Sequence, residues 1–266
     1  MKIDYKETTS DLLTRIDIHN KFGSKDIDVW MLETLKLQRG SKILDVGCGA
    51  GKQCFSFYNY LEGDCNITGG DVSDELLRQA REENKKFDNK VTFTELNFNK
   101  PFAFPSNEFD LLSCCFAIYY SENIPFTIRE MHRVIKPGGR LFTTGPMPDN
   151  KKVFYDIIRE ATGKPIPPMP GSSRFGSEIL NTVKSLFSEV KVEIFENPLV
   201  FTSAQPFVDY TRASLSEDRR LWVSLFDNKS GFEQVMRQIT DVANKRIVMD
   251  KQIVMTKVVG GIFATK

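Results

Sequence analysis

A cluster of three glycines is the first feature of the sequence that suggests chemistry. Residues 43–51 read ILDVGCGAG, in which an apolar run ends in an aspartate and glycines follow at every second position. Glycine permits positive φ values and lets a ligand approach the backbone closely. The free amides of a following helix favour polar or anionic ligand groups. Position 52, where a dinucleotide-binding fingerprint has its third glycine, is lysine. The turn therefore predicts a nucleotide-type ligand without a diphosphate.

Polar or small residues also end the next three apolar runs. Asp71 closes the segment NITGGDV, Asn97 and Phe98 close KVTFTELNF, and SCCFA occupies positions 113–117. In open α/β sheets a ligand binds outside the carboxyl ends of the strands. An aspartate there can accept both hydroxyls of a ribose, and an amide can pair with an adenine edge while an apolar neighbour packs on the ring. These residues predict one ligand with a ribose, a base and a polar tail.

These residues can contact one ligand only if their strands end side by side. The pattern from residue 42 to residue 136 predicts such an arrangement. Short β-rich runs alternate there with segments of helical spacing, which implies a parallel sheet with helices on both faces. The expected strands are 41–46, 66–72, 90–98, 109–120 and 140–146, and the expected helices are 52–63, 73–87 and 124–135.

The pattern changes after residue 146. The proline-rich stretch 163–173 predicts a loop. The expected helices beyond it are 175–187, 207–226 and 232–250, and the expected strands are 189–195 and 257–266. We therefore divide the chain into an N-terminal helical cap segment (1–39), a cofactor-binding core (40–146), and a substrate cap with the final strands (147–266).

Composition excludes several classes of protein. Lys and Arg together number 36 and Asp and Glu 35, and this near-neutral balance argues against broad nucleic-acid binding. No stretch approaches the roughly 20 apolar residues of a membrane span. The five cysteines show no metal-type spacing, so we expect reduced thiols, no metal and a cytoplasmic location. The oligomeric state is not assigned.

Four segments in order resemble the class I S-adenosylmethionine-dependent methyltransferases. These are LDVGCGAG, GGDVS, NFNKPFAFPSNEFDLL and REMHRVIKPGGRLF, and the resemblance spans roughly residues 40–146. It implies a Rossmann-like, doubly wound, mostly parallel seven-stranded sheet that ends in a reversed hairpin, with a helical cap. It also implies S-adenosylmethionine as the cofactor.

The resemblance assigns roles to particular residues. Those implied to border the methionine part of the cofactor are Asp45, Gly47, Cys48 and Gly49. Asp71 would hold the ribose hydroxyls and Val72 would lie against the adenine. Asn97 and Phe98 would contact the adenine, although the family often has Asp at the first of these positions, and Cys114 would lie beside the cofactor.

Candidate catalytic residues lie outside the glycine turn. In this family the segment before the first strand often covers the cofactor, so His19 is a candidate general base and Arg15, one helical turn earlier, a candidate ligand of the cofactor carboxylate. The alternatives are a packing histidine and a solvent-facing arginine. Tyr119 and Tyr120 follow the fourth strand, where they would position the substrate, act as a base or line the pocket. Four phenylalanines are candidates for an apolar pocket: Phe154, Phe175, Phe201 and Phe207.

The sequence thus predicts methyl transfer to an O, N or C atom of a small, partly apolar metabolite by in-line displacement. The NPPY pattern associated with methylation of planar amino groups is absent, and SCCF stands in its place. The alternatives are a methyltransferase acting on tRNA or protein, a non-catalytic S-adenosylmethionine-binding protein, and a nucleotide-dependent oxidoreductase, which the lysine at position 52 disfavours.

Overall fold

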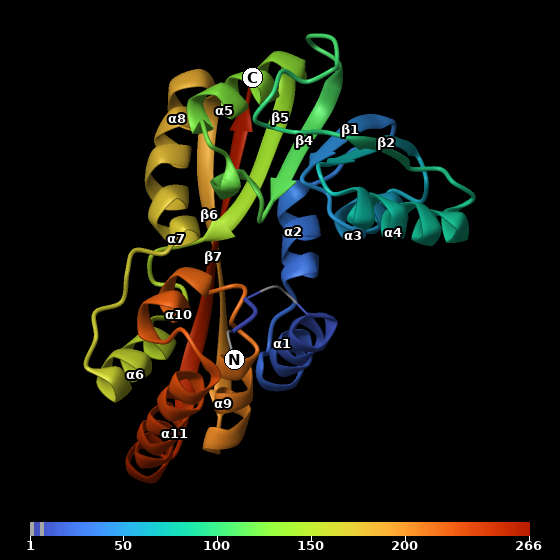
Figure 1. The fold of residues 1–266 in the computed structure, drawn as a ribbon. Helices are drawn as coiled ribbons and strands as arrows, with labels where there is room; N and C mark the ends of the chain where they lie inside the picture. The colour runs from blue at the N-terminus through green and yellow to red at the C-terminus, as the bar shows by residue number, and fades with distance from the viewer. Residues whose placement is uncertain (1–2, 6–7) are drawn as a thin grey trace. The chain divides into compact units, whose positions relative to one another are not determined.

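Seven strands of the described residues form one sheet of doubly wound order. The computed structural model describes residues 3–5 and 8–266. The strand order is β3-β2-β1-β4-β5-β7-β6 (Figure 1). The pairings among the first five strands are parallel, and β7 pairs with β5 antiparallel, which confirms the expected sheet. The strands are β1 (Ser41–Val46), β2 (Cys65–Asp71), β3 (Thr92–Glu95), β4 (Phe109–Cys115), β5 (Ile135–Pro146), β6 (Ser188–Phe201) and β7 (Ile253–Thr265).

The chain folds into two compact units that are each built from several segments. The first unit comprises Met1–Asp26, Asp149–Met169 and Glu196–Val258. The second comprises Ile27–Pro148, Pro170–Phe195 and Val259–Lys266, and it contains the glycine turn.

Helices cover both faces of the sheet in the second unit. The α5 and α8 helices contribute to one apolar cluster with β1, β4 and β5, and α2, α3 and α4 contribute to the other (Figure 1). The sequence of α5 explains this, because Ile124, Ile128, Met131 and Val134 recur at helical spacing and are fully buried. The elements are α2 (Ile27–Leu35), α3 (Lys52–Tyr60), α4 (Asp74–Asn84), η1 (Lys85–Phe87), η2 (Ile118–Tyr120), α5 (Ile124–Val134), α7 (Pro170–Arg174), the π-helical turn η3 (Phe175–Ile179) and α8 (Leu180–Leu186).

An aromatic core holds the first unit together. Phe154 makes edge contacts with the rings of Phe207, Tyr210 and Trp222, and all four side chains are fully buried. The helices that supply and surround this core are α1 (Thr9–Phe22), α6 (Lys152–Thr162), α9 (Ala204–Arg212), α10 (Arg219–Leu225) and α11 (Lys229–Asp250).

Three element predictions are corrected by the structure. The strand expected over 109–120 ends at Cys115, and the short turn η2 follows it. The single helix expected over 207–226 is two helices, α9 and α10, separated by residues 213–218. Asp218 lies at the end of this break, and its carboxylate contacts the Lys151 ammonium at 2.7 Å. The loop expected over 163–173 ends early, because α7 starts at Pro170, and proline is favoured at the first position of a helix.

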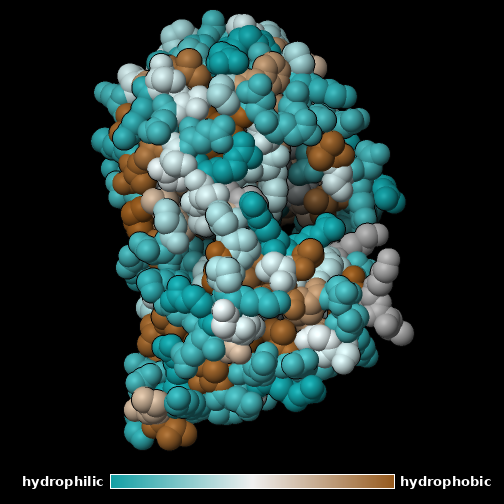
Figure 2. Space-filling view, turned by 60° about the vertical axis from the view of Figure 1, so that its left-hand side comes forward, coloured by the Kyte–Doolittle hydropathy of each residue, from teal (hydrophilic) through white to brown (hydrophobic). Residues whose placement is uncertain are grey.

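No helix among the described residues is long and apolar enough to span a membrane. Figure 2 shows one face of the molecule, on which hydrophilic residues predominate and the hydrophobic ones form separate small groups.

Candidate functional site

The glycine turn joins β1 to α3 and is tied to the end of the neighbouring strand β2. The backbone amides of Gly47 and Cys48 donate to the Gly70 carbonyl at 2.7 and 3.1 Å. Gly47 and Gly49 have φ values of +73° and +54°, which lie in the left-handed region that favours glycine. A Cβ on Gly47 would lie 2.5 Å from the Ala117 Cβ. Both the conformation and the space therefore require glycine at position 47.

Asp71 ends β2 with its carboxylate fixed by two backbone amides. Gly49 N–H donates to Oδ2 at 2.8 Å, and Ser73 N–H donates to Oδ1 at 2.9 Å. A carboxylate offers about four acceptor positions, so each oxygen keeps capacity for a further donor. The two amides thus fix the orientation of the carboxylate, which can still accept hydrogen bonds from a pair of hydroxyl groups.

This site lies at the point of the sheet where ligands bind in open α/β folds. The strand order reverses between β1 and β4, and the glycine turn follows β1. Ligands bind outside the carboxyl ends of strands at such a switch point. A Cβ on Gly49 would meet nothing nearer than Leu76 Cδ1 at 4.0 Å, so the turn leaves open space along its backbone. Val72, directly after Asp71, is 62% exposed.

The predicted adenine contacts lie after β3. The Asn97 side-chain oxygen accepts from Asn99 N–H at 2.9 Å, which orients the amide. Phe98 packs at the margin of the core on the α5 side, and its carbonyl accepts from Thr127 Oγ1 at 2.8 Å. The structure therefore holds both residues in place after β3, and their contact with a base stays a prediction.

Cys114 lies at the end of β4, and its place beside the cofactor stays a prediction. Cys114 is fully buried in the cluster that includes α5, and burial raises the pKa of its thiol well above the ordinary value. The residues that follow β4 lie closer to the glycine turn or to the surface. Phe116 is 37% exposed with φ +56°, and Ala117 lies against Gly47. Both stand in the SCCFA segment, but strand alternation alone did not show which side chains point outward.

Asp45 is a buried acid beneath the turn. It is 2% exposed; Ser113 Oγ donates to its Oδ1 at 2.5 Å, and Cys54 Sγ lies 3.5 Å from its Oδ2. Burial raises its pKa from 3.8 to about 6, against the opposing effect of these two hydrogen bonds. Its place beside the methionine part of the cofactor stays a prediction.

This raised pKa predicts a pH dependence of stability. Between about pH 4 and about pH 6 the unfolded chain ionises at Asp45 while the folded chain keeps the proton, so stability falls as pH rises, by about 3 kcal/mol in total. Asp45→Asn is expected to remove this loss, as measured by urea unfolding across that range. The exposed Asp64→Asn variant should keep the wild-type slope, and an unchanged slope in Asp45→Asn would contradict the assignment.

Tyr119 and Tyr120 lie on the short turn η2 after β4. Their rings are 4.7 Å apart, and Tyr120 is 69% exposed. Arg174 donates to the carbonyls of Tyr119 and Ser121 at 2.9 and 2.7 Å, which fastens η2 to α7. The position of this pair is therefore fixed within the second unit, and its role in substrate binding stays a prediction.

His19 and Arg15 belong to α1 in the first unit. Burial, followed by the charge of Lys257, lowers the pKa of His19 to about 3. An imidazole with that pKa is neutral near pH 7 and a weak base. The role of His19 as a general base stays a prediction. Arg15 donates to the Ala213 carbonyl, and its Nε lies 3.6 Å from Glu217 Oε2. Its contact with a cofactor carboxylate stays a prediction.

Sequence reasoning missed a buried charged cluster in the same unit. Lys151 is 1% exposed, and its ammonium lies 2.7 Å from Asp218 and 3.2 Å from Glu217. Tyr155 donates to the second Asp218 oxygen at 2.8 Å. Burial alone would lower the Lys151 pKa, but the two carboxylates raise it well above the ordinary value. No local motif marks this cluster, because its members come from distant segments.

The four phenylalanines proposed for an apolar pocket are core residues instead. Each is fully buried; Phe175 lies in the cluster around α5, and the other three, Phe154, Phe201 and Phe207, lie in the core of the first unit. Aromatic side chains of this size stabilise a core by the apolar area they bury.

Part of the chain is similar to known methyltransferases. Residues 37–163 match the family model described as methyltransferase domain. A demethylmenaquinone methyltransferase of Listeria welshimeri is 34% identical over 138 residues, which are 49% of this chain and 58% of that protein. The chain thus matches little more than half the length of this curated relative.

Solved structures share the fold at low sequence identity. The YcgJ protein of Bacillus subtilis aligns with a TM-score of 0.59 at 16% identity, covering 90% of this chain and 97% of that one. The phosphoethanolamine N-methyltransferase 2 of Haemonchus contortus, solved with S-adenosyl-L-methionine, aligns with a TM-score of 0.55 at 16% identity, covering 97% of this chain and 57% of that one.

Proposed function

We propose that this chain is a class I, S-adenosylmethionine-dependent methyltransferase that transfers a methyl group to an oxygen, nitrogen or carbon atom of a small, partly apolar metabolite. The match of residues 37–163 to a methyltransferase-domain model supports this proposal. The observation that supports this best is the Asp71 carboxylate, held by Gly49 and Ser73 amides at the switch point of the sheet. Its remaining acceptor capacity suits the two hydroxyls of a ribose.

The residues of the turn fit S-adenosylmethionine better than a dinucleotide. The open space beside Gly49 admits a ligand against the backbone, and Lys52 occupies the position of a third fingerprint glycine. When bound, the cofactor supplies a sulfonium methyl group with a good leaving group. Asp71 would hold the ribose, Val72 and Phe98 would flank the adenine, and Asn97 would pair with its edge.

Methyl transfer requires the protein mainly to align the reacting atoms. The acceptor atom, the methyl carbon and the sulfur must lie in line with water excluded, and only some acceptors need a proton removed. Tyr119 and Tyr120 are our candidates for positioning the acceptor, and His19 is a candidate neutral hydrogen-bonding partner. The Listeria relative is named for methyl transfer to demethylmenaquinone, which supports a small-molecule acceptor.

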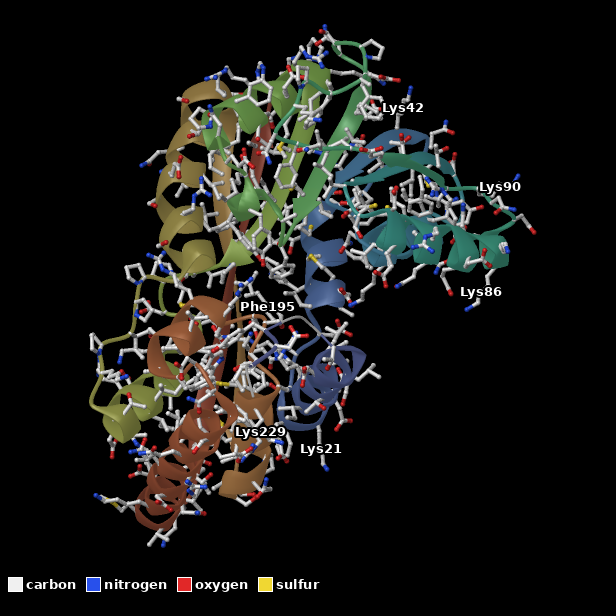
Figure 3. All side chains as sticks on the ribbon, viewed as in Figure 1. Lys21, Lys42, Lys86, Lys90, Phe195 and Lys229 are labelled. Carbon is white, nitrogen blue, oxygen red and sulfur yellow. The ribbon has the colours of Figure 1, made fainter. Side chains whose placement is uncertain are left out.

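The distribution of basic residues gives no reason to prefer a nucleic-acid substrate. In the second unit the labelled residues Lys86 and Lys90 stand near one another at the right of Figure 3, and Lys42 stands apart from them. Lys42 contacts Glu108 at 2.5 Å and Lys86 contacts Glu83 at 2.7 Å, so acids neutralise both.

The proposal is tested by calorimetric titration with S-adenosylhomocysteine, with NADH as the control ligand. We expect binding of the first and none of the second. Incubation with methyl-labelled S-adenosylmethionine and fractionated metabolites should then label a small molecule. NADH binding without S-adenosylhomocysteine binding would refute the cofactor, and label appearing only in added tRNA or protein would refute the substrate class.

A further inference from the structure

The first half of β6 is an exposed sheet edge in the second unit. The strand is the last in the sheet order, with β7 as its neighbour on one side (Figure 1). The residues from 188 to 194 are exposed, apart from the half-buried Val190. The ring of Phe195, labelled in Figure 3, lies tilted against the Trp30 ring with 5.3 Å between the ring centres. An edge strand offers a row of backbone donors and acceptors that can pair with another chain.

The side chains of this edge alternate between apolar and charged. Val190 packs against the cluster that contains α8, and Val192 and Ile194 are 37% and 45% exposed. Glu189, Lys191 and Glu193 face the other side, where they line a groove of about 300 Å³ together with residues of α2, β5 and β7. Such alternation fixes which side chains would meet across a new strand pair.

The two charges nearest the centre of the edge are unmatched within the described part of the chain. Neither Lys191 nor Glu193 takes part in an ion pair there. The sequence around them, Val-Lys-Val-Glu-Ile, is complementary to itself when read antiparallel about its central valine.

We propose that two copies of this chain associate about a twofold axis through antiparallel pairing of this edge, with Val192 facing the partner's Val192. Lys191 then faces the partner's Glu193, and Glu193 faces the partner's Lys191. Val190 faces the partner's Ile194 on the opposite side of the ribbon. The same patch serves both copies, as a twofold interface requires, and backbone hydrogen bonds between edges add to the side-chain pairs.

The register centred on Val192 pairs a longer stretch of the exposed strand than the alternative register centred on Val190. A pair centred on Val190 would also bring Lys191 opposite the partner's Glu189. That register would, however, place Glu193 beyond the start of the partner's strand at Ser188 and shorten the overlap. The position of Glu193 therefore separates the two arrangements experimentally.

Sedimentation velocity over a dilution series tests the proposal on the full chain. The wild type is expected to dimerise. Lys191→Glu and Glu193→Lys should each raise the dimer dissociation constant about tenfold or more, because like charges then face each other at two symmetric places. The double variant Lys191→Glu/Glu193→Lys restores both attractions and should recover the wild-type constant.

Lys184→Glu is the matched control, since it makes the same charge change at an exposed position on α8. It should leave the dissociation constant unchanged. A wild type that stays monomeric overturns the proposal. A dimer that ignores both single substitutions, or that the double variant fails to restore, overturns it as well. None of these outcomes depends on cofactor binding or methyl transfer.

Discussion

Replacing Asp71 with alanine is expected to weaken the binding of S-adenosylhomocysteine by about 10²- to 10⁴-fold. Hydrogen bonds to a charged group contribute about 1.5–3 kcal/mol each, and the variant loses two of them to the ribose. It also leaves the Gly49 and Ser73 amides without the acceptor that orders them. Calorimetric titration of the wild type and the variant measures the change.

Asp74→Ala is the matched control for this experiment. It removes the same charge three residues away, from an exposed position in the first turn of α4. Its binding of S-adenosylhomocysteine should stay within a few-fold of the wild type, because it lacks the contact to the turn. Equal losses in the two variants would show that general charge, and not a ribose contact, accounts for the effect of Asp71.

Lys151→Met is expected to lower the free energy of unfolding by about 3–5 kcal/mol, the cost of leaving a buried carboxylate without its cation. The ammonium contacts Asp218 and Glu217 and lies 5.0 Å from the centre of the Phe154 ring. Urea unfolding measures the change. The neighbouring Lys152 is paired with Asp156 at the surface, 67% exposed, so Lys152→Met should cost about 0–1 kcal/mol.

A double variant separates charge from packing in this cluster. Lys151→Met/Asp218→Leu removes both partners of the closest pair, so no uncompensated charge remains from it. The double variant should therefore have a higher free energy of unfolding than Lys151→Met. It should stay below the wild type by about 1 kcal/mol or more, because the hydrogen bond that Tyr155 donates to Asp218 is lost. If the double variant is less stable than Lys151→Met, or if Lys151→Met costs no more than Lys152→Met, the ion pair does not have the role assigned to it.

The core elements were predictable because their signals are local. The β1 segment SKILDV is an apolar run followed by the glycine turn, and its burial needs no knowledge of the remaining chain. The α5 helix shows its buried face directly in its spacing. Asp71 could be placed at a strand end for the same reason, since a parallel sheet brings such ends together wherever strands and helices alternate.

Other features required knowledge of which segments meet. Whether Cys114 or Phe116 faces outward depends on the alternation of β4 and on the backbone turn after it, where Phe116 takes a positive φ. Residues 213–218 separate α9 from α10, and Asp218 at the end of this break contacts Lys151, which is distant in sequence. Helical periodicity describes neighbours along the chain and contains no information about such a partner.

By itself the sequence determined the alternation of strands and helices, the glycine turn and the strand-end residues Asp71 and Asn97, because each depends on neighbours within one element. Only the tertiary structure decided that the Gly49 amide donates to the Asp71 carboxylate and that Cys114 and the four phenylalanines are buried. The same holds for the low pKa of His19 and for the charged cluster at Lys151. These depend on desolvation and on charges brought together from distant segments, and both quantities exist only once the chain has folded.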